Sequence, residues 1–148
     1  MRSVTVETWI AASEEACFDA ARDLDLHVRS LAHTNEQAVA GRTSVLIELG
    51  EDVTWRGRHF GVMQHFTSKI TAFERPHYFQ DTMQRGAFKS FVHDHYFSTV
   101  NGGTTMCDVV AFAAPLGVLG WMAERVLLER YLTRVLGARA LVIKAAVE

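Results

Sequence analysis

The chain has 148 residues, a length that suits one domain with a sizeable core. Hydrophobic residues make up 49% and charged residues 22%, which is the balance of a globular protein rather than a disordered one. The formal net charge of -2 argues against the broad basic surface of a nucleic-acid-binding protein and against a polybasic membrane tether. We therefore expect a single domain over residues 1–148 that has no nucleic-acid partner.

The two cysteines, Cys17 and Cys107, form no disulfide framework and no metal-binding spacing, which favours a reducing cytoplasm. A secretory signal is not expected, because acidic residues from Glu14 onward stand where its apolar segment would continue. The longest uncharged stretch, 109–123, is too short and too interrupted by Pro115 and glycines to span a bilayer. These features predict a cytoplasmic protein without membrane insertion.

The predicted elements begin with a strand at 4–10, where β-branched residues alternate with polar ones. Ser13 followed by two glutamates is typical of a helix N-cap, so a helix is expected to about residue 22. A second short helix is expected at 24–31, and 42–50 is expected to be a loop or a short ordered insert. Further strands are predicted at 36–39, 52–60, 62–73, 77–83, 88–98 and 104–113, followed by a long helix at 117–146.

The order of these elements predicts the fold class. Closely spaced strands separated by glycine- and proline-containing turns are typical of an antiparallel meander. The last helix is apolar on most of its sides, so it must be largely enclosed. We expect an α+β protein in which a curved antiparallel sheet is wrapped around a long C-terminal helix. Such an arrangement leaves room for an apolar ligand pocket between its two layers.

Three stretches resemble the START and polyketide cyclase/dehydratase superfamily, also called SRPBCC, and within it a bacterial ligand-binding or cyclase-like branch. They are GEDVTWRGRHFG at 50–61, ERPHYFQD at 74–81, and HDHYF with GTTMCD at 93–97 and 103–108. The resemblance covers nearly the whole chain and implies a helix-grip fold with a hydrophobic cavity between sheet and C-terminal helix. It implies no obligatory metal. Members include lipid carriers, hormone receptors, aromatic cyclases and chaperone activators, so the resemblance does not select an activity.

The alternation of side chains along each strand predicts which residues face the cavity. Arg56 and Arg58 belong in water, which places Trp55 and His59 on the inner face of their strand. The same reasoning is applied to the later strands, and one residue is added from the final helix. The predicted ligand-binding residues are Trp55, His59, Phe66, Phe79, Asp81, His93, His95, Met106, Asp108 and Met122.

The last two strands are expected to pair across a four-residue, glycine-containing loop, which puts His95 directly opposite Asp108. We predict that these two side chains form a hydrogen bond inside the cavity. Asp81 is expected one strand away, near Phe91 or His93. Because buried carboxylates need partners, three roles stay open for this polar group: structural pairing within the sheet, anchoring of a ligand, and general acid–base catalysis.

The function that these patterns favour is the binding of a small hydrophobic or amphipathic molecule in the internal cavity. The alternative is a cyclase- or dehydratase-type enzyme that uses His95 with Asp108 or Asp81 as general acid and base. A third possibility is a protein-interaction module with a closed cavity. The His-x-His motif with His59 and an aspartate has metal-ligand chemistry, but an aspartate opposite a histidine is more often its hydrogen-bond partner. We therefore expect no metal and no cofactor.

Overall fold

Seven strands form one antiparallel sheet in this computed structural model, which describes residues 2–31, 34–59, 61–114 and 127–148. The strands are β1 (Arg2–Ile10), β2 (Gln37–Gly41), β3 (Asp52–His59), β4 (Val62–Glu74), β5 (Tyr78–Arg85), β6 (Ser90–Val100) and β7 (Gly103–Ala113). Their order is β1-β7-β6-β5-β4-β3-β2, and every neighbouring pair is antiparallel. The predicted meander is confirmed, and β1 joins it beside β7.

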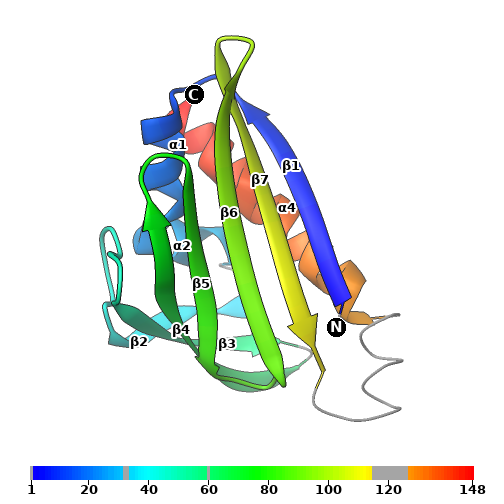
Figure 1. Ribbon diagram of the computed structural model, residues 1–148. Helices are drawn as coiled ribbons and strands as arrows, with labels where there is room; N and C mark the ends of the chain where they lie inside the picture. Colours follow the sequence, from blue (N-terminus) through cyan, green and yellow to red (C-terminus); the bar gives the residue numbers. More distant parts are fainter. Residues whose placement is uncertain (1, 32–33, 60, 115–126) are drawn as a thin grey trace.

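The helices formed by the described residues lie on one side of this sheet (Figure 1). They are α1 (Glu14–Ala21), α2 (Leu24–Ser30) and the C-terminal α4 (Glu129–Val147). The N-cap predicted at Ser13 is confirmed, because its Oγ accepts a hydrogen bond from the Ala16 N–H at 3.2 Å. The part of the last helix predicted from 117 to 126 lies outside the described residues. The sheet curves across α4, as the helix-grip fold requires (Figure 1).

Within the described residues, no helix combines the length and the apolar character needed to cross a membrane.

The β6–β7 hairpin sets the register that positions the polar residues of the inner face. Its turn is Asn101-Gly102, and both residues have positive φ angles, 51° and 76°. Such a two-residue turn matches the twist of the flanking strands, and asparagine and glycine tolerate the left-handed conformation that it needs. Val100 pairs with Gly103, and from there the register places His95 opposite Asp108. The predicted pairing is therefore confirmed.

Several predicted strand boundaries differ from the structure by one or two residues, and two neighbouring strands show this most clearly. The strands expected at 77–83 and 88–98 lie at Tyr78–Arg85 and Ser90–Val100, so their shared turn occupies 86–89. The predicted turn at Arg85-Gly86 was placed too early, because strand pairing carries β5 as far as Arg85, which lies opposite Thr67 of β4. Residues 42–50 are a loop, as expected.

Phe18 of α1 is the centre of the largest packed cluster. Its ring meets Phe73, Phe79 and Phe97 edge-on, with centroids 5.2 to 5.4 Å apart. Edge-to-face contacts of this kind add to the free energy gained by burying the rings. A second cluster joins Phe112 and Val110 of β7 to Leu132 and Leu136 of α4. Together these clusters hold the helices at a fixed distance from the sheet.

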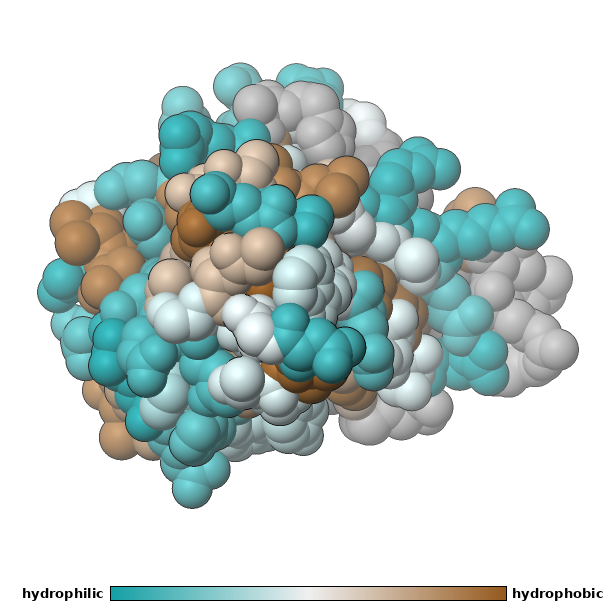
Figure 2. All heavy atoms as spheres, turned by 90° about the horizontal axis from the view of Figure 1, so that it is seen from above, coloured by the Kyte–Doolittle hydropathy of each residue, from teal (hydrophilic) through white to brown (hydrophobic). Residues whose placement is uncertain are grey.

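The outer surface is mixed in polarity. Figure 2 shows one face, seen from above, on which hydrophobic side chains form separate patches among hydrophilic ones. The exposed large hydrophobic residues come from several different elements, among them Val45, Leu49, Val62 and Leu141. Scattered hydrophobic residues of this sort are normal on protein surfaces. Among the described residues, the cluster of titratable side chains that could bind a ligand lies inside the fold.

Candidate functional site

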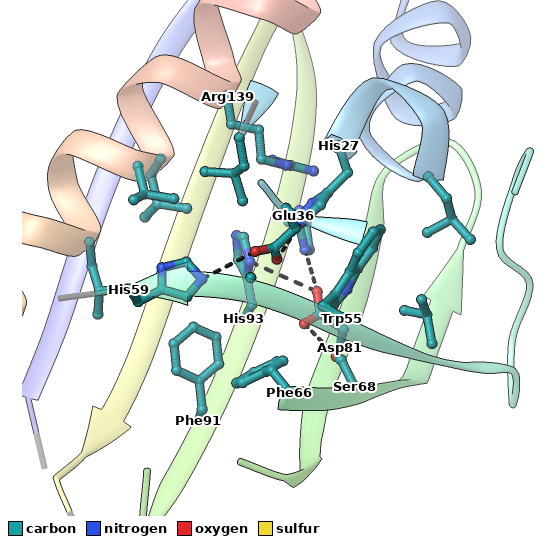
Figure 3. Close-up of a pocket in the computed structure, with 18 of the residues that line it drawn as sticks. His27, Glu36, Trp55, His59, Phe66, Ser68, Asp81, Phe91, His93 and Arg139 are labelled. Carbon is teal, nitrogen blue, oxygen red and sulfur yellow. Dashed lines mark hydrogen bonds and ion pairs between the residues drawn. The ribbon is translucent and has the colours of Figure 1, made fainter. Parts of the chain in front are cut away.

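A pocket of about 370 Å³ lies between the inner face of the sheet and α4. Its apolar wall includes Trp55 of β3, Phe66 of β4 and Phe91 of β6, with Leu132 and Leu136 of α4 opposite them. Figure 3 shows the polar side chains that enter this space from β3, β5, β6 and the segment before β2. The position predicted for the cavity is confirmed.

Most of the predicted ligand-binding residues line this pocket, but not all of them do. Those that line it are Trp55, His59, Phe66, Phe79, Asp81, His93 and His95. Met106 does not, because α1 covers this end of β7 and buries Met106 completely in the cluster around Phe18. Asp108 is also fully buried and lies behind the pocket wall. Met122 lies outside the described residues.

Asp81 is shared by two histidines, and we call Asp81, His93 and His95 the Asp81 cluster. His95 Nε2 donates to Asp81 Oδ2 at 2.7 Å, and His93 Nδ1 lies 3.8 Å from the same oxygen. Ser68 Oγ donates to the other carboxylate oxygen at 2.9 Å. Burial by itself would raise the pKa of Asp81, but the hydrogen bond from His95 and the nearby imidazoles hold this pKa at about 2. Asp81 is therefore an ionised carboxylate at neutral pH.

Asp108 accepts its hydrogen bond from a different histidine than predicted. His93 Nε2 donates to Asp108 Oδ1 at 2.9 Å. His95 Nδ1 lies 3.1 Å from the same oxygen, at ion-pair distance, but its orientation forms no hydrogen bond. Arg139 of α4 adds a contact from Nη1 at 3.3 Å. The predicted hydrogen bond between His95 and Asp108 is thus wrong, although the two residues lie opposite each other and in contact.

The two imidazoles of this group differ in their tendency to hold a proton. Burial and the neighbouring His95 lower the pKa of His93, despite its hydrogen bond to Asp108. Burial acts in the same direction on His95, but its contacts with Asp108 and Asp81 outweigh it and raise the pKa of His95. The rings stack with centroids 3.7 Å apart, so a proton on one disfavours a proton on the other. His95 is therefore the member of the pair that takes up a proton first.

A second carboxylate shared by two histidines was not predicted, and we call Glu36, His27 and His59 the Glu36 cluster. His59 Nε2 donates to Glu36 Oε2 at 3.1 Å, and His27 Nε2 lies 3.6 Å from Oε1. His59 Nδ1 contacts the hydroxyl of Tyr131 on α4, and Trp55 stacks on His27 at 4.0 Å. Burial alone would raise the pKa of Glu36, but the two histidines bring it down to about 2. All three members line the pocket (Figure 3).

Glu36 escaped prediction because the sequence places it at the start of a strand. In the structure β2 begins one residue later, at Gln37, and the Glu36 side chain turns inward over Gly57 of β3. A Cβ atom at Gly57 would collide with the Glu36 carboxylate. The sequence feature that could have indicated Glu36 is therefore the glycine on the inner face of β3 between Trp55 and His59, because it leaves space for another side chain. Arg139 gave no comparable signal, because the final helix reads as an apolar packing element.

Among the described residues, the group whose donor atoms lie close enough together to hold a metal ion is the Asp81 cluster. Each of its members, Asp81, His93 and His95, offers a donor atom within 4.8 Å of the others. A metal ion bound to imidazole lies close to the ring plane, along the nitrogen lone pair. The two rings here are stacked 24° from parallel, so their planes do not converge on one ion nearby. Their nitrogens also face Asp81 and Asp108. This geometry is that of a hydrogen-bonded network.

We therefore expect that removing metal ions leaves the protein unchanged. After dialysis against EDTA, the midpoint of urea unfolding should match that of the untreated protein, and elemental analysis should find no stoichiometric transition metal. Stoichiometric zinc or iron that disappears in a His93→Ala variant would contradict this prediction.

Comparisons with known proteins identify the fold. No protein-family model matches the chain, and no curated protein does. Among solved structures, TTHA0849 from Thermus thermophilus superposes with a TM-score of 0.76 and 16% identity over 99% of this chain and 100% of that one. Major latex-like protein 151 from Panax ginseng gives a TM-score of 0.73 and 15% identity over 99% and 97% of the two chains.

Protein Ms6760 from Mycobacterium smegmatis is similar at a TM-score of 0.70 and 19% identity, over 97% of this chain and 89% of that one. At such low identity the agreement extends to the backbone and says nothing about ligands or activity. It does confirm the architecture that the sequence motifs imply. The chain thus has the helix-grip fold.

Proposed function

We propose that the protein binds a small amphipathic molecule in the pocket between the sheet and α4. The observation that carries this proposal is the pocket itself, whose volume of about 370 Å³ is in the range of small-molecule sites. Aromatic and aliphatic side chains supply most of its wall, and the Asp81 and Glu36 clusters supply a few fixed polar groups. Such a combination binds an apolar body and orients it through hydrogen bonds.

The polar groups are held in place before any ligand arrives, which supports a binding role. Asp81 is fixed by Ser68 and His95, and Glu36 is fixed by His59. A preorganised site loses less conformational entropy on binding than a mobile one. The same groups would orient a bound molecule without having to rearrange.

The cyclase- or dehydratase-type alternative stays a prediction, and the contacts of the two histidines favour His93 over His95 for it. His95 Nε2 is hydrogen-bonded to Asp81, and His95 Nδ1 lies 3.1 Å from Asp108 without a hydrogen bond, so both nitrogens are directed at carboxylates rather than at a substrate. His93 uses only Nε2 in a hydrogen bond, and its Nδ1 is 3.8 Å from Asp81. General acid–base chemistry in this pocket would therefore fall to His93 rather than to His95.

Filling the pocket should weaken ligand binding. Val135 of α4 lines the pocket, so Val135→Trp places an indole in the space that a ligand would take. We expect the neutral fluorescent probe N-phenyl-1-naphthylamine to bind the wild-type protein and to lose at least about tenfold in affinity, or ~1.4 kcal/mol, in this variant. Fluorescence titration measures both affinities.

Leu141→Trp is the matched control, because Leu141 lies on the same helix but is 66% exposed. It adds the same side chain outside the pocket and should bind the probe like the wild type. Failure of the wild-type protein to bind, or equal binding by the Val135→Trp and Leu141→Trp variants, would overturn the proposed function.

A further inference from the structure

We infer that the pocket selects molecules whose polar groups donate hydrogen bonds, hydroxyls or protonated amines, and that it discriminates against carboxylates. This inference rests on the proposed function and adds the chemical class of the ligand. It follows from Asp81 and Glu36, two of the acidic residues that line the pocket, and from the hydrogen bonds that the donors around them make (Figure 3).

Neither Asp81 nor Glu36 is paired with a permanent cation from the part of the chain that the structure describes. Among the described residues, the ion-pair partners of Asp81 are His93 and His95, and those of Glu36 are His27 and His59. The side chains of Asp81 and Glu36 are only 18% and 6% exposed, so water screens their charges poorly. Arginine and lysine remain charged at any physiological pH, whereas histidine does not. The pocket therefore contains buried negative charge that only imidazoles compensate.

The arginines that line the pocket are already committed to protein acceptors. Arg139 contacts Asp108 through Nη1 and donates from Nη2 to the Ala21 carbonyl at 2.6 Å. Arg22 donates to the Ile47 carbonyl and to Glu48. A ligand carboxylate would have to displace one of these acceptors to reach a guanidinium.

The hydrogen bonds of Asp81 and Glu36 also favour a ligand that donates. The N–H groups of His95 and His59 and the hydroxyl of Ser68 all point at the carboxylates. A carboxylate has about four lone-pair sites, and these hydrogen bonds use two on Asp81 and one on Glu36. Both carboxylates therefore can accept further hydrogen bonds, whereas these three donors are already engaged. A ligand O–H or N–H meets that capacity, and a ligand carboxylate meets charge repulsion.

Four naphthalenes of similar size test this selection, since they differ only in their polar group. They are 2-naphthol, 2-naphthylmethylamine in its protonated form, 2-methoxynaphthalene and 2-naphthoate. At pH 8, calorimetric titration of the wild-type protein should show the first two binding at least about tenfold more tightly than 2-naphthoate. The affinity for 2-methoxynaphthalene, which has no hydrogen-bond donor, should lie between the affinities for these two ligands and the affinity for 2-naphthoate.

Removing one negative charge should improve binding of the rejected ligand. We expect the affinity for 2-naphthoate to rise several-fold in Glu36→Gln and in Asp81→Asn, while the preference for 2-naphthol over 2-methoxynaphthalene shrinks. A gain of binding cannot come from a loss of folding. Glu7→Gln makes the same charge change on an exposed residue of β1 and should leave all four affinities unchanged.

The outcomes separate this inference from the function on which it rests. If all four molecules bind the wild type with equal affinity, or 2-naphthoate binds best, the selection for donors is wrong while the binding function stands. If none of them binds, both are wrong. Because the wild-type series decides between these cases, the inference is tested even where a variant fails to fold.

Discussion

Replacing Asp108 with leucine is expected to lower the free energy of unfolding by about 3–5 kcal/mol, the usual cost of removing one partner from a buried ion pair. Asp108 is fully buried, and its Oδ1 is contacted by His93, His95 and the guanidinium of Arg139. Burial would raise the pKa of Asp108, but these contacts hold it well below its ordinary value. Leucine would leave Arg139 as a buried charge without its carboxylate. Urea unfolding followed by circular dichroism measures the loss.

The double variant Asp108→Leu/Arg139→Met is the matched control. It removes the stranded cation, so much of the lost stability should return, because buried ion pairs can be replaced by apolar residues at little net cost. Recovery should be incomplete, since Arg139 also donates to the Ala21 carbonyl at 2.6 Å. If the losses from the two single substitutions simply add in the double variant, the two side chains are not coupled and the assignment is wrong.

Glu36→Gln is expected to remove a contribution to stability that depends on pH. The ordinary pKa of Glu36 is 4.5, and in the folded protein it is about 2. A carboxyl whose pKa is lowered by folding stabilises the folded state above its unfolded pKa and loses that effect as the pH falls through its folded pKa. At ~1.4 kcal/mol per pKa unit, the contribution is on the order of 3 kcal/mol.

The stability difference between wild type and Glu36→Gln should therefore be present above about pH 4.5 and disappear toward pH 2. Urea midpoints measured at pH 6, 4 and 3 test this sign. Other buried carboxylates, such as Asp81, titrate in both proteins, so their effect largely cancels in the difference. Glu7→Gln again serves as the control, with no difference expected at any of these pH values. A difference that grows as the pH falls below 4 would refute the assignment.

The sequence by itself determined the order of the elements and the inner face of each long strand. Side chains alternate strictly along a strand, so exposed Arg56 and Arg58 were enough to turn Trp55 and His59 inward. The same alternation, with a four-residue, glycine-containing loop, placed His95 opposite Asp108, as the register shows. These inferences work because strand geometry is local and periodic.

Only the tertiary structure decided how the polar side chains pair. Backbone register brings His93, His95 and Asp108 together, but rotamers and the neighbouring strand decide that His93 donates to Asp108 and His95 to Asp81. Arg139 reaches Asp108 from a helix 31 residues further along the chain. Glu36 accepts a hydrogen bond from His59 in the space that Gly57 leaves open. Contacts between a helix or loop and a sheet depend on how whole elements pack, and no local periodicity in the chain encodes that packing.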